Sequence, residues 1–411
     1  MIAEILSVGT ELLLGNTANT DAQDISEYLS QLGINVFWHT VVGDNPGRLT
    51  DAVQIAKSRA DLIVTTGGLG PTCDDLTKQV LAAAFGLELY FDEAEADWIR
   101  SYFANRKMTE NNLQQAWLPE GCTIFHNLWG TAPGCTFEKD GVRVIMLPGP
   151  PRECRAMFVN CAMPFLRSLS EGEIVSHNLR IFGKGESEVE FMLRDMMNSM
   201  SNPTLAPYAK EGEMLLRVTA KAATHDEAEK MMEPVIEKMY EMVGDVIYGQ
   251  DVECLEEVVT ALLRERGMTL SAAESCTGGL VSKRMTDLAG ASDVFKGGAV
   301  VYATESKTSL LGVPSALIAE KGVVSAEVAL AMAENVRRVF SSDFGIGITG
   351  FAGPDGDDRY PGGTVFIAIA SAEQSFVRQQ NKGTVRERVR ALAANNAFDM
   401  LRRYLTGLPV E

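Results

Sequence analysis

Two separate parts of this chain alternate short β-rich runs with helical segments, and this alternation constrains the fold more than any other feature. In residues 1–85 the strands AEILSVG, INVFWHTVV and DLIVTTGG alternate with the helices DAQDISEYLSQLG and LTDAVQIAKSRA. Such alternation is typical of an α/β domain with a largely parallel sheet. A further strand over VRVIMLPG at 142–149, followed by a helix to about residue 168, completes a first α/β domain over residues 1–170.

The same alternation returns at the other end of the chain. After the amphipathic helix DVECLEEVVTALLRERG come the strands MTLSAAES, GGAVVYA, FGIGITG and TVFIAIA, with the helices LVSKRMTDLA, AEVALAMAENVRRVF and TVRERVRALAANNAFDMLRRYL. We therefore expect a second α/β domain over residues 251–411. Each α/β domain is expected to hold one chemical centre.

Residues 171–250 predict a small α+β module between them. Strands SHNLRIFG and MLLRVTAKA alternate with two amphipathic helices that carry methionines at 192, 196, 197, 200, 231, 232, 239 and 242. A pliable peptide groove is one interpretation of these methionines. We favour core packing, because methionine is a common gap filler. The module is expected to connect and position rather than react.

Composition excludes several classes of protein. The formal net charge of -18 argues against bulk attraction to nucleic acid or anionic membrane, so neither is an expected partner. The N-terminus lacks the features of a signal peptide and no run of about 18 apolar residues occurs, which predicts a cytoplasmic protein. The seven cysteines form no CxxC pair, and we expect most to be reduced core residues.

The segment AESCTGG at 273–279 is the clearest candidate for chemistry. It lies where a strand passes into a helix, so Ser275, Cys276, Thr277 and the amides of Gly278 and Gly279 should gather at a helix N-terminus. Such a terminus suits an oxyanion or a phosphate, and Ser275 or Cys276 could attack a carbonyl. Ordinary capping of the helix explains the same residues equally well.

A serine nucleophile needs a base, and histidine is absent after His225. A Ser-His-Asp triad within the C-terminal domain is therefore excluded. Lys307 lies just beyond the strand GGAVVYA, and Tyr302 lies on it. A desolvated lysine can lose its proton near neutrality and a tyrosine can relay one. A solvated Lys307 and a packing role for Tyr302 are the alternatives that spacing leaves open.

Two further features of the C-terminal domain concern substrate contacts. The glycines of GIGITGFAGPDG match GxGxxG, but they fall within a strand and a loop follows, so we reject a dinucleotide-binding motif. Thr349 and Gly350 are better explained as the base of a substrate-facing loop. Arg386 and Arg390 share one helix face and could clamp a phosphate, or they could be a solvated face.

Three loops that follow predicted strands should form the N-terminal centre. They are GTELLLGNTANTDA, VTTGGLGPTCDDLT and LPGPPRE, and ligands of open α/β sheets bind at the strand ends. The metal-binding candidates are Asp74 and Asp75, with Glu11 or Asp21, which would hold magnesium or another divalent cation on a diphosphate, with helix capping as the alternative. The expected substrate contacts are Thr10, Asn19, Gly67, Gly68, Gly70, Thr72 and Gly149.

Collinear motifs over essentially the whole chain resemble the CinA (competence/damage-inducible protein) family. VGTELLLG, NTANTDA, TTGGLGPTCDD, GTAPG and LPGPPRE resemble its molybdopterin-binding-like N-terminal domain, and GKGES resembles its KH-type linking module. AESCTGG, the segment from Tyr302 to Lys307, ITGFAGPDG and GGTV resemble its nicotinamide mononucleotide (NMN) deamidase domain. The chain departs from the family pattern at Arg359 and Tyr360, where an acidic-lysine stretch is common.

The resemblance implies two activities in pyridine nucleotide recycling. One is NMN amidohydrolysis to nicotinate mononucleotide and ammonia, without a cofactor, in which Ser275 is the nucleophile, Lys307 the base and Tyr302 its assistant, with Thr349, Gly350 and Arg390 near substrate. The other is a metal-dependent ADP-ribose pyrophosphatase, for which potassium is a further candidate cation. The family also suggests a homodimer. The alternatives are an N-terminal domain that only binds a pterin or nucleotide, and a competence or recombination adaptor.

Overall fold

The structure is a computed structural model of the 411-residue chain, and it describes residues 1–104, 107–169, 172–210 and 212–410. Contacts divide these residues into two compact units. The first is Met1–Val175 with Lys221–Glu229, and the second is Ser176–Ala220 with Lys230–Glu411. Along the described chain, none of the helices combines the length and apolarity needed to cross a membrane.

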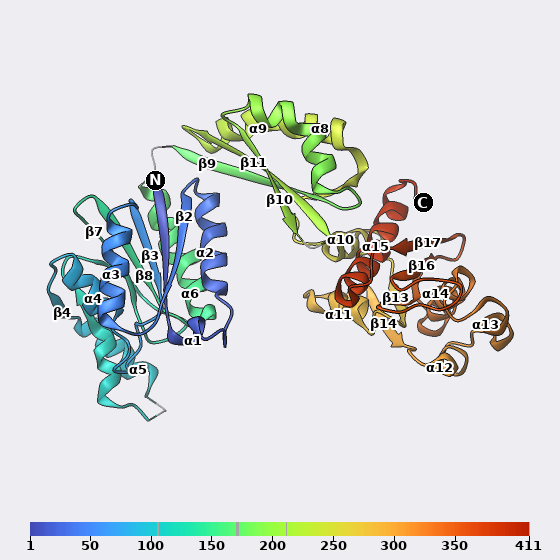
Figure 1. Cartoon of the computed structure of the whole chain (residues 1–411), viewed down its shortest axis with the longest axis horizontal. Helices are drawn as coiled ribbons and strands as arrows, with labels where there is room; N and C mark the ends of the chain where they lie inside the picture. The colour runs from blue at the N-terminus through green and yellow to red at the C-terminus, as the bar shows by residue number, and fades with distance from the viewer. Residues whose placement is uncertain (105–106, 170–171, 211, 411) are drawn as a thin grey trace. The chain divides into compact units, whose positions relative to one another are not determined.

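A six-stranded sheet forms the N-terminal domain (Figure 1). In spatial order its strands are β2 (Asn35–Val42), β1 (Ile2–Val8), β3 (Leu62–Thr66), β8 (Val142–Leu147), β7 (Gly134–Lys139) and β6 (Thr123–Phe125). The first four are mutually parallel, and β7 and β6 add antiparallel. The predicted α/β class is confirmed, although sequence reasoning did not anticipate β6 and β7.

Helices cover both faces of this sheet. Leucines and valines of α3 and α4 build the core on one face, and apolar residues of α2, α6 and α7 build it on the other (Figure 1). The helices are α1 (Thr10–Leu13), α2 (Thr20–Gln31), α3 (Pro46–Lys57), α4 (Thr77–Ala84), α5 (Glu93–Tyr102), α6 (Pro151–Met157) and α7 (Met163–Ser168), with η1 (Glu110–Ala116), η2 (Phe158–Ala162) and the short strands β4 (Leu89–Phe91) and β5 (Trp117–Pro119).

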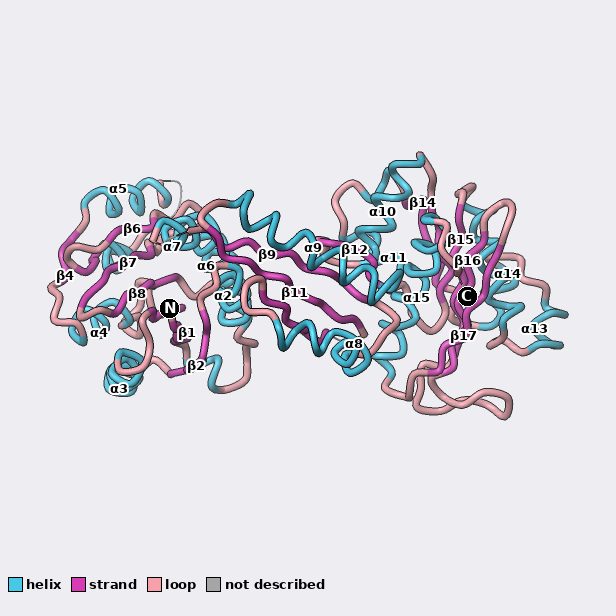
Figure 2. Tube along the Cα trace, turned by 90° about the horizontal axis from the view of Figure 1, so that it is seen from above, coloured by secondary structure: helices cyan, strands magenta, loops and turns pink. Residues whose placement is uncertain are grey.

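The linking module has a four-stranded sheet in the order β10, β11, β9, β12. Figure 2 shows β9 and β11 running side by side. Its elements are β9 (Glu173–Ile181), α8 (Glu186–Ser199), β10 (Thr204–Lys210), β11 (Glu213–Ala222), α9 (His225–Val243), η3 (Gly244–Val246) and β12 (Ile247–Gln250). Of the eight methionines, Met232 and Met239 of α9 are buried in the core, in agreement with the packing interpretation, whereas the other six are half-buried.

The C-terminal domain contains a five-stranded sheet in the order β14, β13, β15, β16, β17. The strands are β13 (Leu270–Glu274), β14 (Phe295–Val300), β15 (Phe344–Gly350), β16 (Thr364–Ala370) and β17 (Ser375–Asn381). The first three in spatial order are parallel, whereas β16 and β17 add antiparallel. The carboxyl ends of β13, β14 and β15 therefore meet at one edge.

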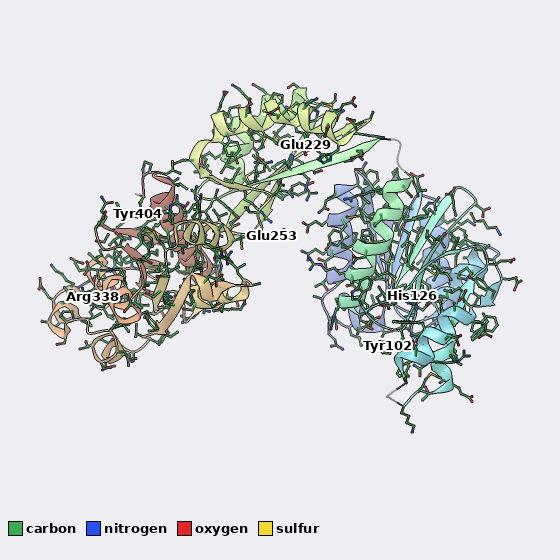
Figure 3. All side chains as sticks on the ribbon, turned by 180° about the vertical axis from the view of Figure 1, so that it is seen from behind. Tyr102, His126, Glu229, Glu253, Arg338 and Tyr404 are labelled. Carbon is green, nitrogen blue, oxygen red and sulfur yellow. The ribbon has the colours of Figure 1, made fainter. Side chains whose placement is uncertain are left out.

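Two helix layers enclose this sheet. Residues of α10, α11 and α15 form the core on one face, and α14 packs on the other. On the first face Tyr404 of α15 (Figure 3) packs edge-on against Phe344, with 5.5 Å between ring centroids. The helices are α10 (Leu255–Arg266), α11 (Leu280–Asp287), α12 (Thr304–Ser309), α13 (Ser315–Lys321), α14 (Ala326–Phe340) and α15 (Arg386–Thr406), with the short η4 (Ala291–Asp293).

Candidate functional site

Ser275 lies at the end of β13, in the tight turn that leads to α11. Its backbone amide donates to the carbonyl of Ile348 on β15 at 3.0 Å. Gly278 and Gly279 have φ values of 62° and 93°, which glycine adopts without the strain that a side chain would cause. The Gly278 amide donates to the Ser275 carbonyl at 3.0 Å and closes the turn. Hydrogen bonds therefore fix the turn at both the amide and the carbonyl of Ser275.

Glu274, which sequence reasoning did not single out, caps α11. Its buried carboxylate accepts from the amides of Val281 at 3.0 Å and Ser282 at 2.8 Å. These first-turn amides would otherwise be free at the helix N-terminus. Because both amides already donate to Glu274, they are not free to bind an anion. Only the turn before the helix can bind the anion that was expected at this terminus. The acidic residue directly before the serine was the sequence signal that could have indicated this cap.

Lys307 of α12 is buried against this turn, with only 1% of its surface exposed. Its Nζ lies 3.1 Å from Ser275 Oγ and 2.8 Å from the Val301 carbonyl oxygen, and a longer contact of 3.4 Å reaches the Tyr302 carbonyl oxygen. Burial disfavours the charged amine and lowers the pKa of Lys307 below its ordinary value. A solvated Lys307, the alternative that spacing left open, does not occur.

Cys276, the other nucleophile that the sequence offers, has a different environment. It packs in the hydrophobic core of the domain and is 5% exposed. Burial raises the pKa of its thiol to about 12. Because the thiolate is the reactive form of cysteine, Ser275 is the better nucleophile in this turn.

A cavity of about 200 Å³ opens onto the Ser275 and Lys307 pair. Its lining comes from the segments after β13 and β14, from α12, from the turn after α13, from the end of β15 with the loop that follows it, and from the start of α15. The lining residues are Ser275, Cys276, Tyr302, Thr304, Lys307, Val323, Val324, Thr349, Gly350, Phe351, Ala352, Gly353, Asp355 and Arg386.

Tyr302 and Arg386 meet at this cavity. Arg386 Nη2 donates to the Tyr302 hydroxyl at 3.2 Å, and its Nη1 donates to the Gly353 carbonyl at 3.2 Å. Tyr302 is 62% exposed, and the atom it presents to Lys307 is its carbonyl oxygen. The structure thus places its hydroxyl beside a guanidinium.

The two arginines of α15 have different surroundings. Arg386 lines the cavity, whereas Arg390 Nη2 donates to the carbonyl of the buried Thr277 at 2.6 Å. Arg390 therefore stabilises the glycine turn through the Thr277 carbonyl. Thr349, expected beside substrate, lines the cavity but donates its hydroxyl to the Val323 carbonyl at 2.8 Å. Gly350 lies directly against β16, where an added Cβ would come within 2.6 Å of Val365 Cα.

The three N-terminal loops lie at the carboxyl ends of β1, β3 and β8. A Cβ on Gly149 would lie 3.2 Å from Gly67 Cα, and Gly67 itself packs against the carbonyl oxygen of Val8. Gly67 and Gly68 both have positive φ, and Gly70 packs against the Asp75 carboxylate. The glycines thus allow close contact between the loops.

Polar contacts fix these loops internally. Thr72 donates to Asp75 Oδ2 through its amide at 2.8 Å and its hydroxyl at 2.7 Å. Asn19 caps α2 by accepting from the Ala22 amide at 3.3 Å. Thr10 donates to Asp44 Oδ2 through its amide at 2.9 Å and its hydroxyl at 2.8 Å. Asp44 follows β2 at this same edge and was missed, although VVGDNPG after a predicted strand was a usable signal.

The four carboxylates predicted to hold a metal do not form one group. Among the described residues, no cluster of three or more histidine, cysteine, aspartate or glutamate side chains is suited to a metal. Asp75 already accepts two hydrogen bonds from Thr72, and Asp21 is buried on α2, where burial raises its pKa to about 6. The donor set as it stands does not fit a divalent cation.

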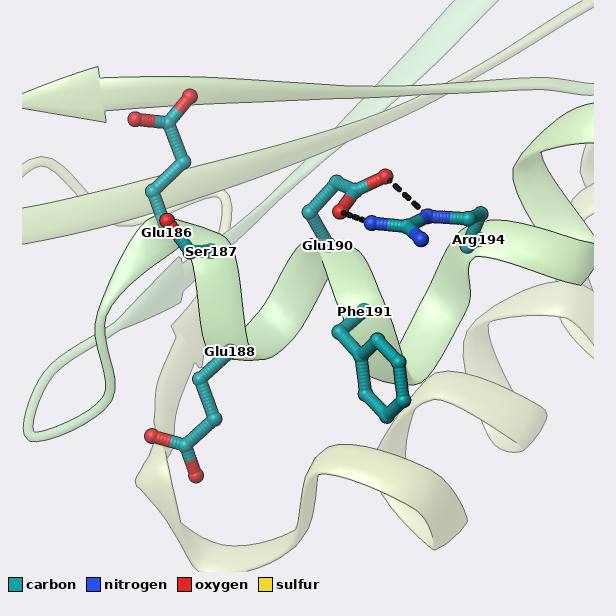
Figure 4. Close-up of a pocket in the computed structure, with 6 residues that line it drawn as sticks. All are labelled: Glu186, Ser187, Glu188, Glu190, Phe191 and Arg194. Atoms are coloured by element: carbon teal, nitrogen blue, oxygen red, sulfur yellow. Dashed lines mark hydrogen bonds and ion pairs between the residues drawn. The ribbon is translucent and has the colours of Figure 1, made fainter.

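A shallow hollow on α8 carries acidic and aromatic side chains (Figure 4). Arg194 donates to both oxygens of Glu190, at 2.8 Å and 2.6 Å, and Lys184 pairs with Glu188. The ring of Phe191 is 72% exposed. These are ordinary pairs of a solvated helix face, and we assign no chemistry to them.

Three family models match successive parts of the chain. Residues 4–168 match the model described as "Probable molybdopterin binding domain". Residues 176–249 match the "Damage-inducible protein CinA KH domain", and residues 252–405 match the "CinA C-terminal domain". The three matches follow one another in the order of the motifs that resemble the family's N-terminal domain, KH-type module and C-terminal domain.

Relatives are similar over the full length. A CinA-like protein from Dictyoglomus turgidum is 46% identical over 411 residues, covering 99% of this chain and 100% of the relative. Another from Desulfovibrio desulfuricans is 47% identical over 416 residues, covering 100% and 98%. A crystal structure of the protein CinA with unknown function from Thermoplasma acidophilum is 36% identical, covers 40% of this chain and 96% of its own, and has a TM-score of 0.38. With full-length relatives at this identity, the chain belongs to the CinA family.

Proposed function

We propose that the C-terminal domain hydrolyses the carboxamide of NMN to nicotinate mononucleotide and ammonia. The observation that carries the proposal is the 3.1 Å contact between Ser275 Oγ and the buried Nζ of Lys307. A serine paired with a lysine of lowered pKa is suited to attack on an acyl carbon. The choice of NMN as substrate rests on the resemblance of AESCTGG and ITGFAGPDG to the deamidase motifs.

The cavity supports this choice of substrate. Its small volume of about 200 Å³ suits a single aromatic ring with a carboxamide, which would place the acyl carbon at Ser275. Arg386 supplies a guanidinium at the cavity, and guanidinium groups bind phosphate in two-point contacts. A ligand with a carboxamide at one end and a phosphate at the other matches both features.

In the first half of the reaction the neutral amine of Lys307 takes the Ser275 proton. Two N–H groups of that amine donate to the carbonyls of Val301 and Tyr302, so its lone pair is left for the serine hydroxyl. The Ser275 oxygen bonds to the carboxamide carbon, and the carbonyl oxygen becomes an oxyanion. We expect the amides of the 276–279 turn to stabilise this charge, apart from the Gly278 amide, which donates to the Ser275 carbonyl.

In the second half the carbon–nitrogen bond breaks. Lys307 returns its proton to the departing nitrogen, which leaves as ammonia, and the acyl group stays on Ser275 as an ester. Water then attacks the ester carbon while Lys307 accepts a proton from it. The ester bond breaks, Ser275 regains its hydrogen and nicotinate mononucleotide is released.

Ammonia release from NMN by the purified chain tests the proposal. Ser275→Ala should abolish it, and Ser306→Ala serves as a matched control because Ser306 lies on α12 outside the cavity lining. If Ser275→Ala keeps the rate of the unaltered chain, the nucleophile assignment is lost. If neither protein releases ammonia, the substrate assignment is lost.

The ADP-ribose pyrophosphatase activity of the N-terminal domain stays a prediction. The converging glycine loops support binding of a nucleotide or pterin at this edge. The carboxylate arrangement gives no support to a metal-dependent cleavage step. Incubation with ADP-ribose, with and without magnesium, and identification of the products separates binding from hydrolysis.

A further inference from the structure

The loop between β15 and β16, residues 351–363, forms one wall of the candidate deamidase cavity. Phe351, Ala352, Gly353 and Asp355 of this loop line the cavity. At its base the Phe351 amide donates to the Thr364 carbonyl at 2.8 Å, and the Gly363 amide donates to the Phe351 carbonyl at 2.7 Å. These bonds hold the two ends of the loop together but leave its tip to other contacts.

The tip forms its own turn around one carboxylate. Asp357 Oδ1 accepts from the amides of Arg359 at 3.0 Å and Tyr360 at 2.8 Å. The Tyr360 ring packs edge-on against Phe366 of β16, with 5.2 Å between centroids. These contacts give the turn at the tip a defined shape.

Arg359 reaches from this tip to the end of α13. Its Nη1 donates to the Lys321 carbonyl at 2.6 Å and lies 3.5 Å from the Glu320 carbonyl oxygen. The last carbonyls of a helix lack partners within the helix and carry partial negative charge, so a guanidinium there is favourable. Gly322 leaves room for it, since a Cβ at that position would lie 3.1 Å from Arg359 Nη1.

The turn held in this way forms another part of the wall of the same cavity. Val323 and Val324, directly after Gly322, line the cavity. The Val323 carbonyl accepts from Thr349 Oγ1 at 2.8 Å, which ties the turn to the end of β15. Arg359 and Thr349 thus hold one short segment from two sides, and the loop and the α13 turn are joined through Arg359.

We infer that Arg359 is a positioning residue that sets the distance between these two cavity walls and so determines how tightly substrate is bound. This rests on the proposed amide hydrolysis at Ser275. The reacting pair itself does not depend on the loop tip, because Ser275 is held by β15 and Lys307 by the Val301 carbonyl. Loss of Arg359 should therefore change binding of substrate and leave the chemical step in place.

Steady-state kinetics of ammonia release from NMN tests the inference. Arg359→Ala should raise KM about three- to tenfold, the range expected when one charge-assisted hydrogen bond at an exposed side chain is lost, with kcat within about twofold. Arg359→Lys should restore part of the affinity. Arg338→Ala is the matched control, since Arg338 (Figure 3) is a solvated arginine of α14 paired with Glu334. Equal KM values for Arg359→Ala and the unaltered chain, or a fall in kcat at unchanged KM, would overturn the role.

Hydrogen exchange without substrate keeps this test independent of the proposed function. Arg359→Ala should speed amide exchange in residues 322–324, and Arg338→Ala should not. Unchanged exchange in both variants overturns the inference even where NMN is hydrolysed. If the unaltered chain releases no ammonia while amide exchange in residues 322–324 rises only in Arg359→Ala, the positioning role of Arg359 is upheld. The substrate assignment alone then fails.

Discussion

Ser275 and Lys307 come within 3.1 Å of each other because the register of β13 and β14 brings their supports together. Glu274 pairs with Val300 in that register, and the Val301 amide donates to the Glu274 carbonyl at 2.8 Å. Ser275 follows Glu274 in the chain, and Lys307 Nζ bonds back to the Val301 carbonyl at 2.8 Å. Strand pairing thus fixes the geometry of the pair, and a shift in that register would separate the proposed nucleophile from its proposed base.

The pH dependence of NMN hydrolysis should follow the ionisation of Lys307. Only the neutral amine accepts the Ser275 proton, and burial lowers the pKa of Lys307 from its ordinary 10.5. The value of kcat/KM should therefore rise with pH, as the lysine loses its proton, and level off above a midpoint that lies below 10.5. Initial rates of ammonia release across pH 5–10 measure this.

Lys307→Arg provides the contrast for that profile. A guanidinium stays protonated throughout the accessible range, so the variant should lose activity at every pH rather than shift its midpoint. Full activity in Lys307→Arg would mean that another group accepts the serine proton. A rate of the unaltered chain that falls as pH rises would show that Lys307 must be charged.

Arg386 and Arg390 should differ in what they do for substrate. Arg386 lines the cavity, so Arg386→Gln should raise KM for NMN about tenfold, which corresponds to the loss of one good phosphate contact. Hydrolysis of nicotinamide riboside, which lacks the phosphate, should be little affected. KM measured for both substrates tests this, and an equal rise for both would exclude Arg386 from phosphate binding.

Arg390→Gln is the control for that comparison. Arg390 supports the Thr277 carbonyl in the glycine turn, so its loss should disturb the position of Ser275. We expect kcat to fall with both substrates alike. A rise in KM confined to NMN in this variant would instead place the phosphate at Arg390.

How much of the site could be predicted depended on whether a residue acts through its own segment or through distant ones. The turn at Ser275 was predictable, because a β-run, two glycines and a helical period adjoin in sequence. Burial of Lys307 was not, because it arises from the register of two strands. The sequence did not predict the different surroundings of Arg386 and Arg390, for a related reason. Their spacing puts both on one helix face, but only packing shows that one meets the cavity and the other a carbonyl.

The fold shows the same division. Alternating patterns predicted β1, β2 and β3 and their helices, since each has its own hydrophobic period. The three-residue strand β6 (Thr123–Phe125) and the polar strand β17 (Ser375–Asn381) were not predicted, because their hydrophobic pattern is weak and pairing with neighbouring strands stabilises them. The four carboxylates predicted to bind a metal do not form one group, and this too depends on tertiary packing. Asp21 lies on a helix whose packing turns its side chain toward the core.

Asp21→Asn should stabilise the N-terminal domain at neutral pH. Asp21 is 8% exposed, and its Oδ1 has no hydrogen-bond partner among the described residues. Burial raises its pKa from 3.8 to about 6, so the folded state binds this proton more tightly than the unfolded state does. The native state is therefore penalised increasingly as pH rises from about 4 to 6, and the full penalty remains at pH 7.

The neutral amide removes that penalty. We expect the free energy of unfolding to rise by about 1 to 2 kcal/mol at pH 7.5 and to change little near pH 3.5, where the carboxyl is mostly protonated in both states. Urea unfolding followed by tryptophan fluorescence reports on this domain alone, because all 4 tryptophans lie before residue 130. Asp51→Asn, at an exposed position of α3, is the control. Lower stability of Asp21→Asn at pH 7.5, together with loss of magnesium-dependent turnover of ADP-ribose, would instead identify Asp21 as a charged metal ligand.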